Sequence, residues 1–211
     1  MKLNKLFSRA RPSLYFFLII IGSISFLTLN SAHGNSPEKQ YQGLLLKPEK
    51  TIKSYTMINQ YGKEIPFPKA SGKFQLIFFG YTNCPDVCPM TLHKIKQVIH
   101  DLDNDKKVEY YFISIDAERD KPELLKSFVS YFHPQIKGIT GTIHNVKGIE
   151  KEFGILTRKF QGKSALAYQL EHSVFLYLIN RQGKLMLMYP GSSSTTQIVS
   201  DLNLLLDSDQ N

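Results

Sequence analysis

Two cysteines four positions apart are the residues of this sequence best suited to chemistry. Cys84 and Cys88, its only cysteines, directly follow the apolar run of residues 74–81 (FQLIFFGY), which predicts a strand buried on both faces. Apolar residues spaced three or four apart then predict a helix over residues 90–102. Unpaired N–H groups at the start of such a helix stabilise thiolates. The pair is therefore suited to reversible disulfide formation or to the capture of a soft cation such as Cu(I), and two sulfurs alone do not decide between these uses.

A histidine far along the chain is the candidate for a third ligand. His172 directly precedes a predicted buried strand, residues 173–179 (SVFLYLI), at a sheet end where its ring can face the cysteines. Its imidazole would complete a set of two sulfurs and one nitrogen. A lone histidine is more often structural, so the residue type by itself leaves this role open. The other histidines have no partner in the sequence pattern and are assigned no site: His33, His93, His100, His133 and His144.

The remaining patterns predict the elements that position these residues. Hairpins are expected at residues 54–65 and 173–189, and a further strand at residues 108–115. Further helices are expected at residues 120–131, 142–153 and 195–206. We expect Asp120 and Thr142 to cap the helices that they precede, and Gly154 to end the second of them. Strands that alternate with helices and end in a hairpin plus a helix predict an α/β, thioredoxin-like fold, with a central mixed β-sheet flanked by helices.

The composition indicates a globular domain behind an address segment. The chain has 211 residues, of which 42% are hydrophobic and 21% charged, and a mean hydropathy of −0.20, which excludes polytopic membrane, disordered and fibrous proteins. Four cations with no acidic partner precede the apolar residues 14–29 and account for half of the net charge of +8. Residues 1–34 are therefore predicted to be a signal peptide or an N-terminal membrane anchor, followed by a linker over residues 35–50 and a folded domain over residues 51–211.

The charge distribution also bears on location and partners. The positive charge left after the N-terminal segment is ordinary and contains no long basic run, so we expect no nucleic-acid partner. The short basic head favours a bacterial inner membrane with the domain facing the periplasm, or an exported periplasmic protein if the signal is cleaved. No cysteine lies near the cleavage region, which excludes lipidation there.

The cysteine turn and its surroundings resemble a known family. Residues 79–92 (FGYTNCPDVCPMTL) closely resemble the signature of the SCO1/SenC family of membrane-tethered copper proteins. The similarity continues in the family's order through residues 114–120 (SIDAERD), 138–142 (GITGT), 171–173 (EHS) and 189–191 (YPG). Ala117 stands where the family usually has proline, and Glu171 where aspartate is commoner, but neither change removes a ligand.

This resemblance implies a site and a role. It implies a thioredoxin-like domain in which Cys84, Cys88 and His172 bind a copper ion. It also implies a metallochaperone that assists assembly of the binuclear copper centre of cytochrome c oxidase subunit II, with that subunit as the copper acceptor and an upstream periplasmic donor. The departures at Ala117 and Glu171 keep all three ligands and bear on the client instead of on copper binding.

Two enzymatic alternatives remain. In a membrane-tethered thiol-disulfide oxidoreductase, Cys84 and Cys88 would form a redox-active dithiol that reduces the cysteines of that subunit, with Cys84 attacking first. A peroxidase would need an arginine beside the cysteine, and the sequence places none there. Asp86, Asp116 and Asp120 are interpreted as helix-terminus and turn residues, and residues 160–171 as an arm that carries His172.

Overall fold

A central sheet of parallel and antiparallel strands organises the domain. The computed structural model describes residues 40–102, 105–162 and 167–208. Eight strands follow one another across the sheet in the order β1-β10-β9-β4-β5-β6-β2-β3. Their bounds are β1 Leu44–Thr51, β2 Tyr55–Asn59, β3 Glu64–Phe67, β4 Phe74–Gly80, β5 Val108–Ser114, β6 Ile136–Thr140, β9 Phe175–Ile179 and β10 Lys184–Pro190. The strands β4, β5 and β6 are parallel to one another, whereas β9 is antiparallel to β4, so the predicted mixed sheet is confirmed.

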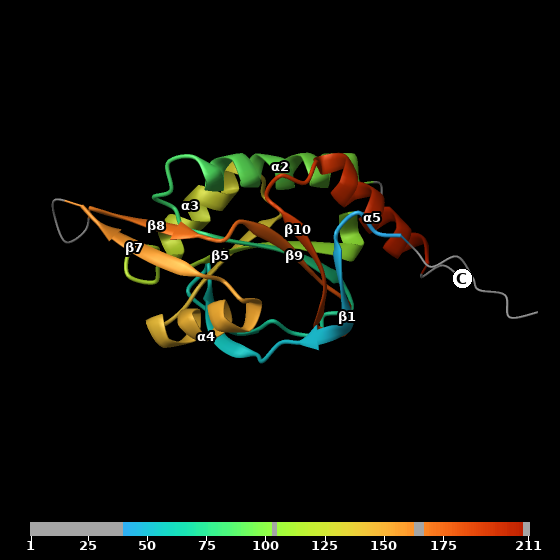
Figure 1. Cartoon of the computed structure of the whole chain (residues 1–211). Helices are drawn as coiled ribbons and strands as arrows, with labels where there is room; N and C mark the ends of the chain where they lie inside the picture. The colour runs from blue at the N-terminus through green and yellow to red at the C-terminus, as the bar shows by residue number, and fades with distance from the viewer. Residues whose placement is uncertain (1–39, 103–104, 163–166, 209–211) are drawn as a thin grey trace, which may run out of the picture. The chain divides into compact units, whose positions relative to one another are not determined.

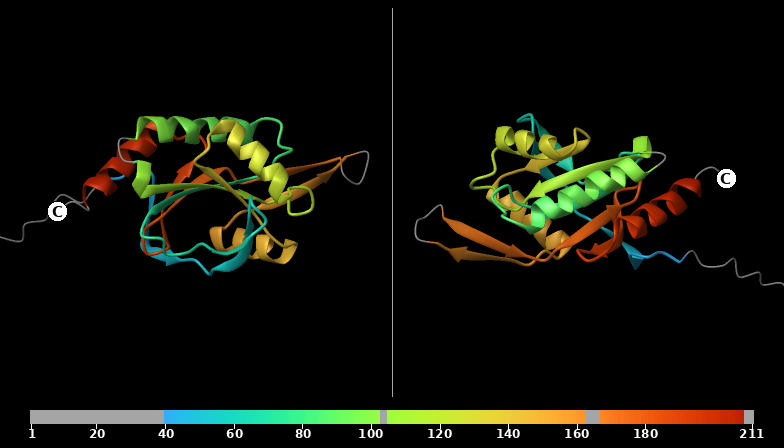
Figure 2. Two further views of the ribbon diagram at one scale, coloured as in Figure 1. Left: turned by 180° about the vertical axis from the view of Figure 1, so that it is seen from behind. Right: turned by 90° about the horizontal axis from the view of Figure 1, so that it is seen from above.

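Helices cover both faces of this sheet. The helices α2 (Val87–Asp101), α3 (Pro122–Phe132) and α5 (Thr195–Asp207) lie on one face, and α4 (Ile143–Phe153) lies on the other (Figure 1). The views from behind and from above show the same arrangement (Figure 2). A single-turn 3-10 helix, Asp105–Lys107, precedes β5. A separate two-stranded sheet, formed by β7 (Thr157–Gln161) and β8 (Tyr168–His172), extends from one end of the domain.

The core forms where the apolar patterns of the sequence meet. Every residue of β4 is buried, as expected for a strand with helices on both faces. The buried residues of α2 recur every three or four positions, so this helix packs one apolar stripe on the sheet. At the start of α4, Thr142 accepts a hydrogen bond from the N–H of Asn145, and at its end Gly154 has a φ of 69°, so both predicted helix ends are confirmed.

Helix α2 begins earlier than its apolar spacing predicts. It starts at Val87, which places Cys88 inside its first turn and Cys84 in the preceding connection. The first turn can accommodate Pro89, because N–H groups at that position have no intrahelical acceptor. Sequence spacing alone placed the start at residue 90, after this proline.

Two other boundaries need correction. The strand β1 begins at Leu44, inside the predicted linker of residues 35–50, and pairs with β10, so the folded unit begins before Thr51. The predicted capping role of Asp120 is wrong, because α3 has Lys121 at its N-cap, with no side-chain cap, and begins with Pro122. The carboxylate of Asp120 instead accepts hydrogen bonds from Thr82 and Ser114.

The segment expected to be an arm carrying His172 contains paired strands. Thr157 pairs with His172 and Gln161 with Tyr168 in the antiparallel β7–β8 ladder. His172 is therefore the last residue of a strand, and a short connection leads from it into β9.

Candidate metal centre

The connection from β4 to α2 presents the two cysteines at different depths. The N–H of Cys84 donates to the carbonyl oxygen of Tyr81 at 3.3 Å, which folds the connection into a turn. The N–H of Cys88 donates to Sγ of Cys84 at 3.4 Å. Cys84 is half-buried, whereas Cys88 is fully buried in the core, and both are free thiols. One sulfur is thus accessible from the surface and the other is sheltered.

The two thiols have opposite pKa shifts because their surroundings differ. A hydrogen bond from the Cys88 thiol is the largest factor that lowers the pKa of Cys84, to about 5, and the backbone N–H groups of Asp86 and Cys88 lower it further. The pKa of Cys88 is raised, first because its thiol is hydrogen-bonded to Cys84 and second because it is buried. At neutral pH the pair therefore consists of an outer thiolate and an inner thiol that share one proton.

His172, at the end of β8, approaches the buried sulfur of Cys88. Its Nε2 atom lies 4.0 Å from Sγ of Cys88, and its Nδ1 atom lies 3.0 Å from the carbonyl oxygen of Ser173. Because a carbonyl oxygen only accepts hydrogen bonds, this contact places the proton of the neutral ring on Nδ1. The lone pair of Nε2 then faces the sulfur.

Aromatic side chains enclose the imidazole. The ring centroids of Phe78 and Tyr81 lie 6.3 and 6.4 Å from that of His172, and the Tyr81 contact is edge-on. A cavity of about 290 Å³ opens beside Cys84 and His172, with Phe160 and Val174 also in its wall. The site is therefore partly desolvated and remains open to a partner.

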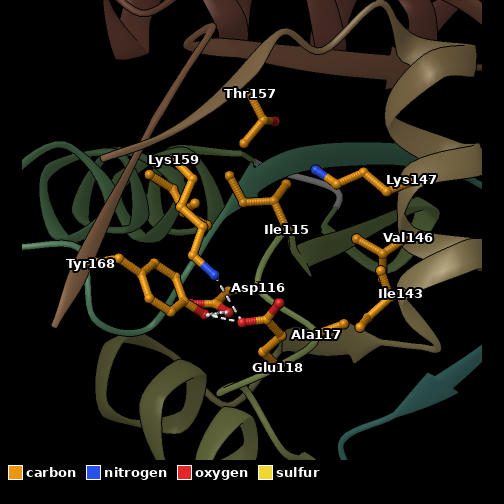
Figure 3. A pocket seen from close by; sticks show the side chains of 11 residues that line it. Ile115, Asp116, Ala117, Glu118, Ile143, Val146, Lys147, Thr157, Lys159 and Tyr168 are labelled. Carbon is orange, nitrogen blue, oxygen red and sulfur yellow. Dashed lines mark hydrogen bonds and ion pairs between the residues drawn. The ribbon is translucent and has the colours of Figure 1, made fainter. Parts of the chain in front are cut away.

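A second cavity lies under the β7–β8 hairpin and holds neither thiol nor histidine. It has a volume of about 150 Å³, an apolar floor that includes Ile115 and Val146, and a polar edge (Figure 3). Two charged groups of that edge pair with each other, since Nζ of Lys159 lies 3.0 Å from a carboxylate oxygen of Glu118. This cavity therefore offers no donor set for a soft metal ion.

The two cysteine sulfurs and the imidazole nitrogen form a donor set that fits a soft metal ion when these three atoms move closer to one another. Within the described ranges, no group of three or more His, Cys, Asp or Glu side chains is already arranged to hold a metal ion. A sulfur and a nitrogen bound to one ion at about 2.3 and 2.0 Å can lie up to about 4.3 Å apart. The 4.0 Å between Cys88 and His172 lies within that limit, so these two atoms can share an ion with little movement.

The structure gathers the three residues that the sequence singled out, whereas His33 lies outside the described residues. Cys84, Cys88 and His172 come from a loop, a helix and a separate hairpin, and they meet at one end of the sheet. His93 instead packs edge-on against Phe132, with ring centroids 5.1 Å apart. The assignment of the three gathered residues as ligands stays a prediction.

Sequence reasoning missed Tyr81. Its hydroxyl donates to Oε1 of Gln169 at 2.9 Å and accepts from the N–H of Leu170 at 3.3 Å, so it links the cysteine loop to the strand of His172. The only signal was its place two residues before the Asn-Cys-Pro turn, which does not show that a distant strand packs there.

The predicted signal or anchor, residues 1–34, lies outside the described residues. Among the helices in residues 40–102, 105–162 and 167–208, none has the length and apolar character of a membrane span.

Known proteins resemble this chain over most of its length. A SCO2-like protein of Rickettsia felis is 34% identical over 173 residues, which are 79% of this chain and 84% of the relative. The structure of Bradyrhizobium japonicum ScoI with copper bound matches with a TM-score of 0.67 and 30% identity, over 72% of this chain and 98% of that one. BsSco, described as a member of the Sco family of cytochrome c oxidase assembly proteins with a disulfide switch, matches with a TM-score of 0.61 and 26% identity, over 79% and 96%. Because the sequence pattern of the SCO1/SenC family also matches residues 45–207, this chain belongs to the SCO1/SenC family.

Proposed function

We propose that this protein is a copper metallochaperone that binds one copper ion through Cys84, Cys88 and His172. The observation that carries the proposal is the approach of Nε2 of His172, with its lone pair directed at the sulfur, to within 4.0 Å of Sγ of Cys88. Two sulfurs and one imidazole nitrogen form a soft donor set that suits Cu(I).

The unequal depths of the ligands suit transfer. The buried Cys88 and the ring of His172 would hold the ion, while the half-buried Cys84 lies on the open cavity, where a partner's ligand can replace it. The thiolate of Cys84 binds the cation without first losing a proton, since its pKa is about 5. Ligand exchange of this kind needs no covalent turnover.

The similar proteins support copper as the cargo and an oxidase as the client. ScoI of Bradyrhizobium japonicum is described with copper bound, and BsSco is described among cytochrome c oxidase assembly proteins. We propose that this chain delivers copper to the binuclear centre of oxidase subunit II and receives it from an upstream periplasmic donor. The basic and apolar N-terminal segment supports a domain that faces the periplasm, tethered to a bacterial inner membrane or released from it.

An anaerobic titration tests the ligand set. Reduced full-length protein, His172→Ala and the matched control His144→Ala compete for Cu(I) with a chromophoric chelator. His144 is an exposed histidine outside the site. We expect one tightly bound copper in the parent and the control, and a loss of most of that affinity in His172→Ala. Equal binding by the parent and His172→Ala would remove His172 from the set.

One observation also favours a second function, thiol-disulfide exchange. The outer thiolate and the inner thiol are arranged as an attacking and a resolving cysteine. Cys84 would attack a client disulfide, and Cys88, after losing its proton, would displace the client as a dithiol, which leaves this protein oxidised. Reduction of a subunit II disulfide that persists in His172→Ala and disappears in Cys84→Ser would support this function. Loss in both variants would contradict a dithiol mechanism that is independent of His172.

A further inference from the structure

The strand that ends in His172 belongs to a sheet of its own. Within the described residues, β8 pairs only with β7, and this hairpin extends from one end of the domain (Figure 1). The hydrogen bonds of the main sheet therefore do not set the position of His172 against the cysteines. Besides the short connection to β9, contacts that side chains make with the hairpin hold it in place.

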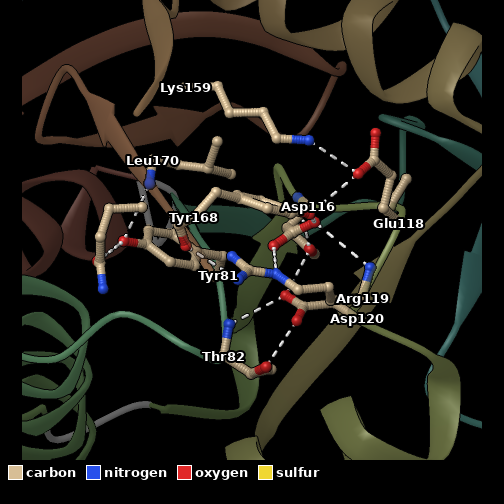
Figure 4. A network of polar contacts seen from close by, with 12 residues as sticks. Tyr81, Thr82, Asp116, Glu118, Arg119, Asp120, Lys159, Tyr168 and Leu170 are labelled. Carbon is tan, nitrogen blue, oxygen red and sulfur yellow. Dashed lines mark hydrogen bonds and ion pairs between the residues drawn. The ribbon is translucent and has the colours of Figure 1, made fainter. Parts of the chain in front are cut away.

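A clamp made by Asp116 and Arg119 holds the first residue of that strand (Figure 4). Nε of Arg119 lies 2.5 Å from Oδ2 of Asp116, and Nη1 of Arg119 donates to the carbonyl oxygen of Tyr168 at 3.0 Å. The guanidinium also lies 3.6 Å from the centroid of the Tyr168 ring. The hydroxyl of Tyr168 donates back to Oδ1 of Asp116 at 2.6 Å. Ring, hydroxyl and carbonyl oxygen of Tyr168 are thus all fixed.

The clamp is buried, which makes these contacts strong. Asp116 is 3% exposed and Tyr168 is 2% exposed, and the side chain of Arg119 is 13% exposed. Charge-assisted hydrogen bonds shielded from water are stronger than exposed ones, and the planar guanidinium presents several donors in a fixed geometry.

The same turn also holds the cysteine loop. The carboxylate of Asp120 accepts from the N–H of Thr82 at 2.9 Å and from its hydroxyl at 2.6 Å, two residues before Cys84. It also accepts from the hydroxyl of Ser114 at 2.7 Å. The N–H of Asp120 donates to the carbonyl oxygen of Asp116 at 2.9 Å, which closes the turn. One end of the turn is therefore bound to the cysteine loop and the other to the histidine strand.

We propose that the turn Asp116–Asp120 is a positioning element that sets His172 against Cys84 and Cys88, with Arg119 as its positioning residue. Arg119 acts on the ligands through Tyr168 and the paired strand that follows. Its guanidinium also lies 5.7 Å from the centroid of the Tyr81 ring, which packs edge-on against His172. The inference deepens the proposed function and rests on it, because it assigns the clamp a role in metal affinity.

A double-mutant cycle tests this assignment. Arg119→Lys keeps the charge and loses the planar fork that reaches Asp116 and Tyr168 together. In the reduced full-length protein we expect it to weaken Cu(I) binding about tenfold, as for other residues that orient a metal ligand. In the His172→Ala background the further loss should be less than about twofold, because Arg119 acts through His172. The control is Arg181→Lys, which alters a guanidinium 5.2 Å from the ring of Phe74 at the other end of β4 and should leave the affinity unchanged.

Hydrogen exchange on the reduced, copper-free proteins tests the positioning separately from the metal. We expect the backbone amides of β8 to exchange faster in Arg119→Lys than in the parent or in Arg181→Lys, while those of α5 are unchanged. Tyr168→Phe removes only the hydroxyl of the clamp and should show the same pattern more weakly, so it serves if Arg119→Lys does not fold.

Each outcome decides a different point. An equal loss of copper affinity in both backgrounds, no loss in either, or unchanged exchange in β8 overturns the inference. If His172→Ala binds copper as the parent does, the proposed ligand set fails, and the exchange data alone then decide whether Arg119 positions β8.

Discussion

Gly80, the last residue of β4, lies so close to Cys88 that a Cβ atom at this position would stand 2.8 Å from the Cys88 Sγ atom. It would also stand 2.9 Å from the ring of Phe112. Both neighbours are fully buried side chains with little freedom to move aside. This position therefore requires glycine, because any side chain would occupy the space of the Cys88 thiol.

We expect Gly80→Ala to displace Cys88 and destabilise the reduced protein by about 1–3 kcal/mol, the usual cost of overpacking a core. Urea unfolding of the reduced protein measures this change. A second substitution, Cys88→Ala, removes the sulfur, so Gly80→Ala should cost less in that background than in the parent. Parental stability of the single Gly80→Ala variant would show that the core absorbs the added methyl group.

The two thiols should differ sharply in reactivity with pH. Because the pKa of Cys84 is about 5 and that of Cys88 is raised, alkylation of the reduced protein should modify Cys84 first, with a rate that rises through pH 5 and levels off. Cys88→Ala removes the hydrogen bond that contributes most to this shift, so the midpoint for Cys84 should move to higher pH. Mass spectrometry of the alkylated peptides identifies the modified cysteine. An unchanged midpoint in Cys88→Ala would instead assign the shift to the backbone N–H groups.

Local patterns in the sequence predicted the centre of the fold. The apolar run of β4 and the periodic apolar residues of α2 are buried in the structure, and the strand, cysteine turn and helix follow one another as expected. These signals were reliable because a strand buried on both faces needs consecutive apolar residues, and a helix buried along one stripe needs apolar residues at regular spacing. The predicted helix end at Gly154 is confirmed for the same reason, since a positive φ favours glycine locally.

The sequence-based predictions were wrong or incomplete where contacts between distant segments determine the structure. The segment Asp120-Lys121-Pro122-Glu123 has the pattern of a helix start, but the carboxylate of Asp120 bonds to Thr82, 38 positions away, instead of capping α3. The strand β1 is mostly exposed, lies at the edge of the sheet and contains Pro48, so its composition resembles that of a linker. The clamp of Arg119 on Tyr168 spans 49 positions and had no local signal.

The start of the folded unit depends on one buried carboxylate. Asp201, in α5, accepts hydrogen bonds from the backbone N–H groups of Gln42 and Gly43, each at 2.9 Å. Asp201→Asn replaces one acceptor oxygen by an NH2 donor that faces these N–H groups, so at least one of the hydrogen bonds is lost, at a cost of about 1–3 kcal/mol. We expect lower stability to urea and faster protease cleavage near residues 40–44. The control Asp207→Asn, at an exposed position of the same helix, should change neither. Parental cleavage of Asp201→Asn would mean that β1 alone fixes this segment.

The hydroxyl of Tyr81 should influence copper affinity more than stability. Tyr81→Phe keeps the ring beside His172 and removes the hydrogen bonds to Gln169 and Leu170. Tyr111→Phe is a matched control, because it removes a hydroxyl that donates to Glu109 from another buried tyrosine of the domain. Tyr111→Phe should lose about 1 kcal/mol of stability, the usual contribution of one hydrogen bond, and Tyr81→Phe about 1–2 kcal/mol, because its hydroxyl makes two. Only Tyr81→Phe should also weaken Cu(I) binding, because it releases the strand that carries His172. Equal copper affinity in the two variants would leave Tyr81 with a purely structural role and would place the control of His172 in the Arg119 clamp alone.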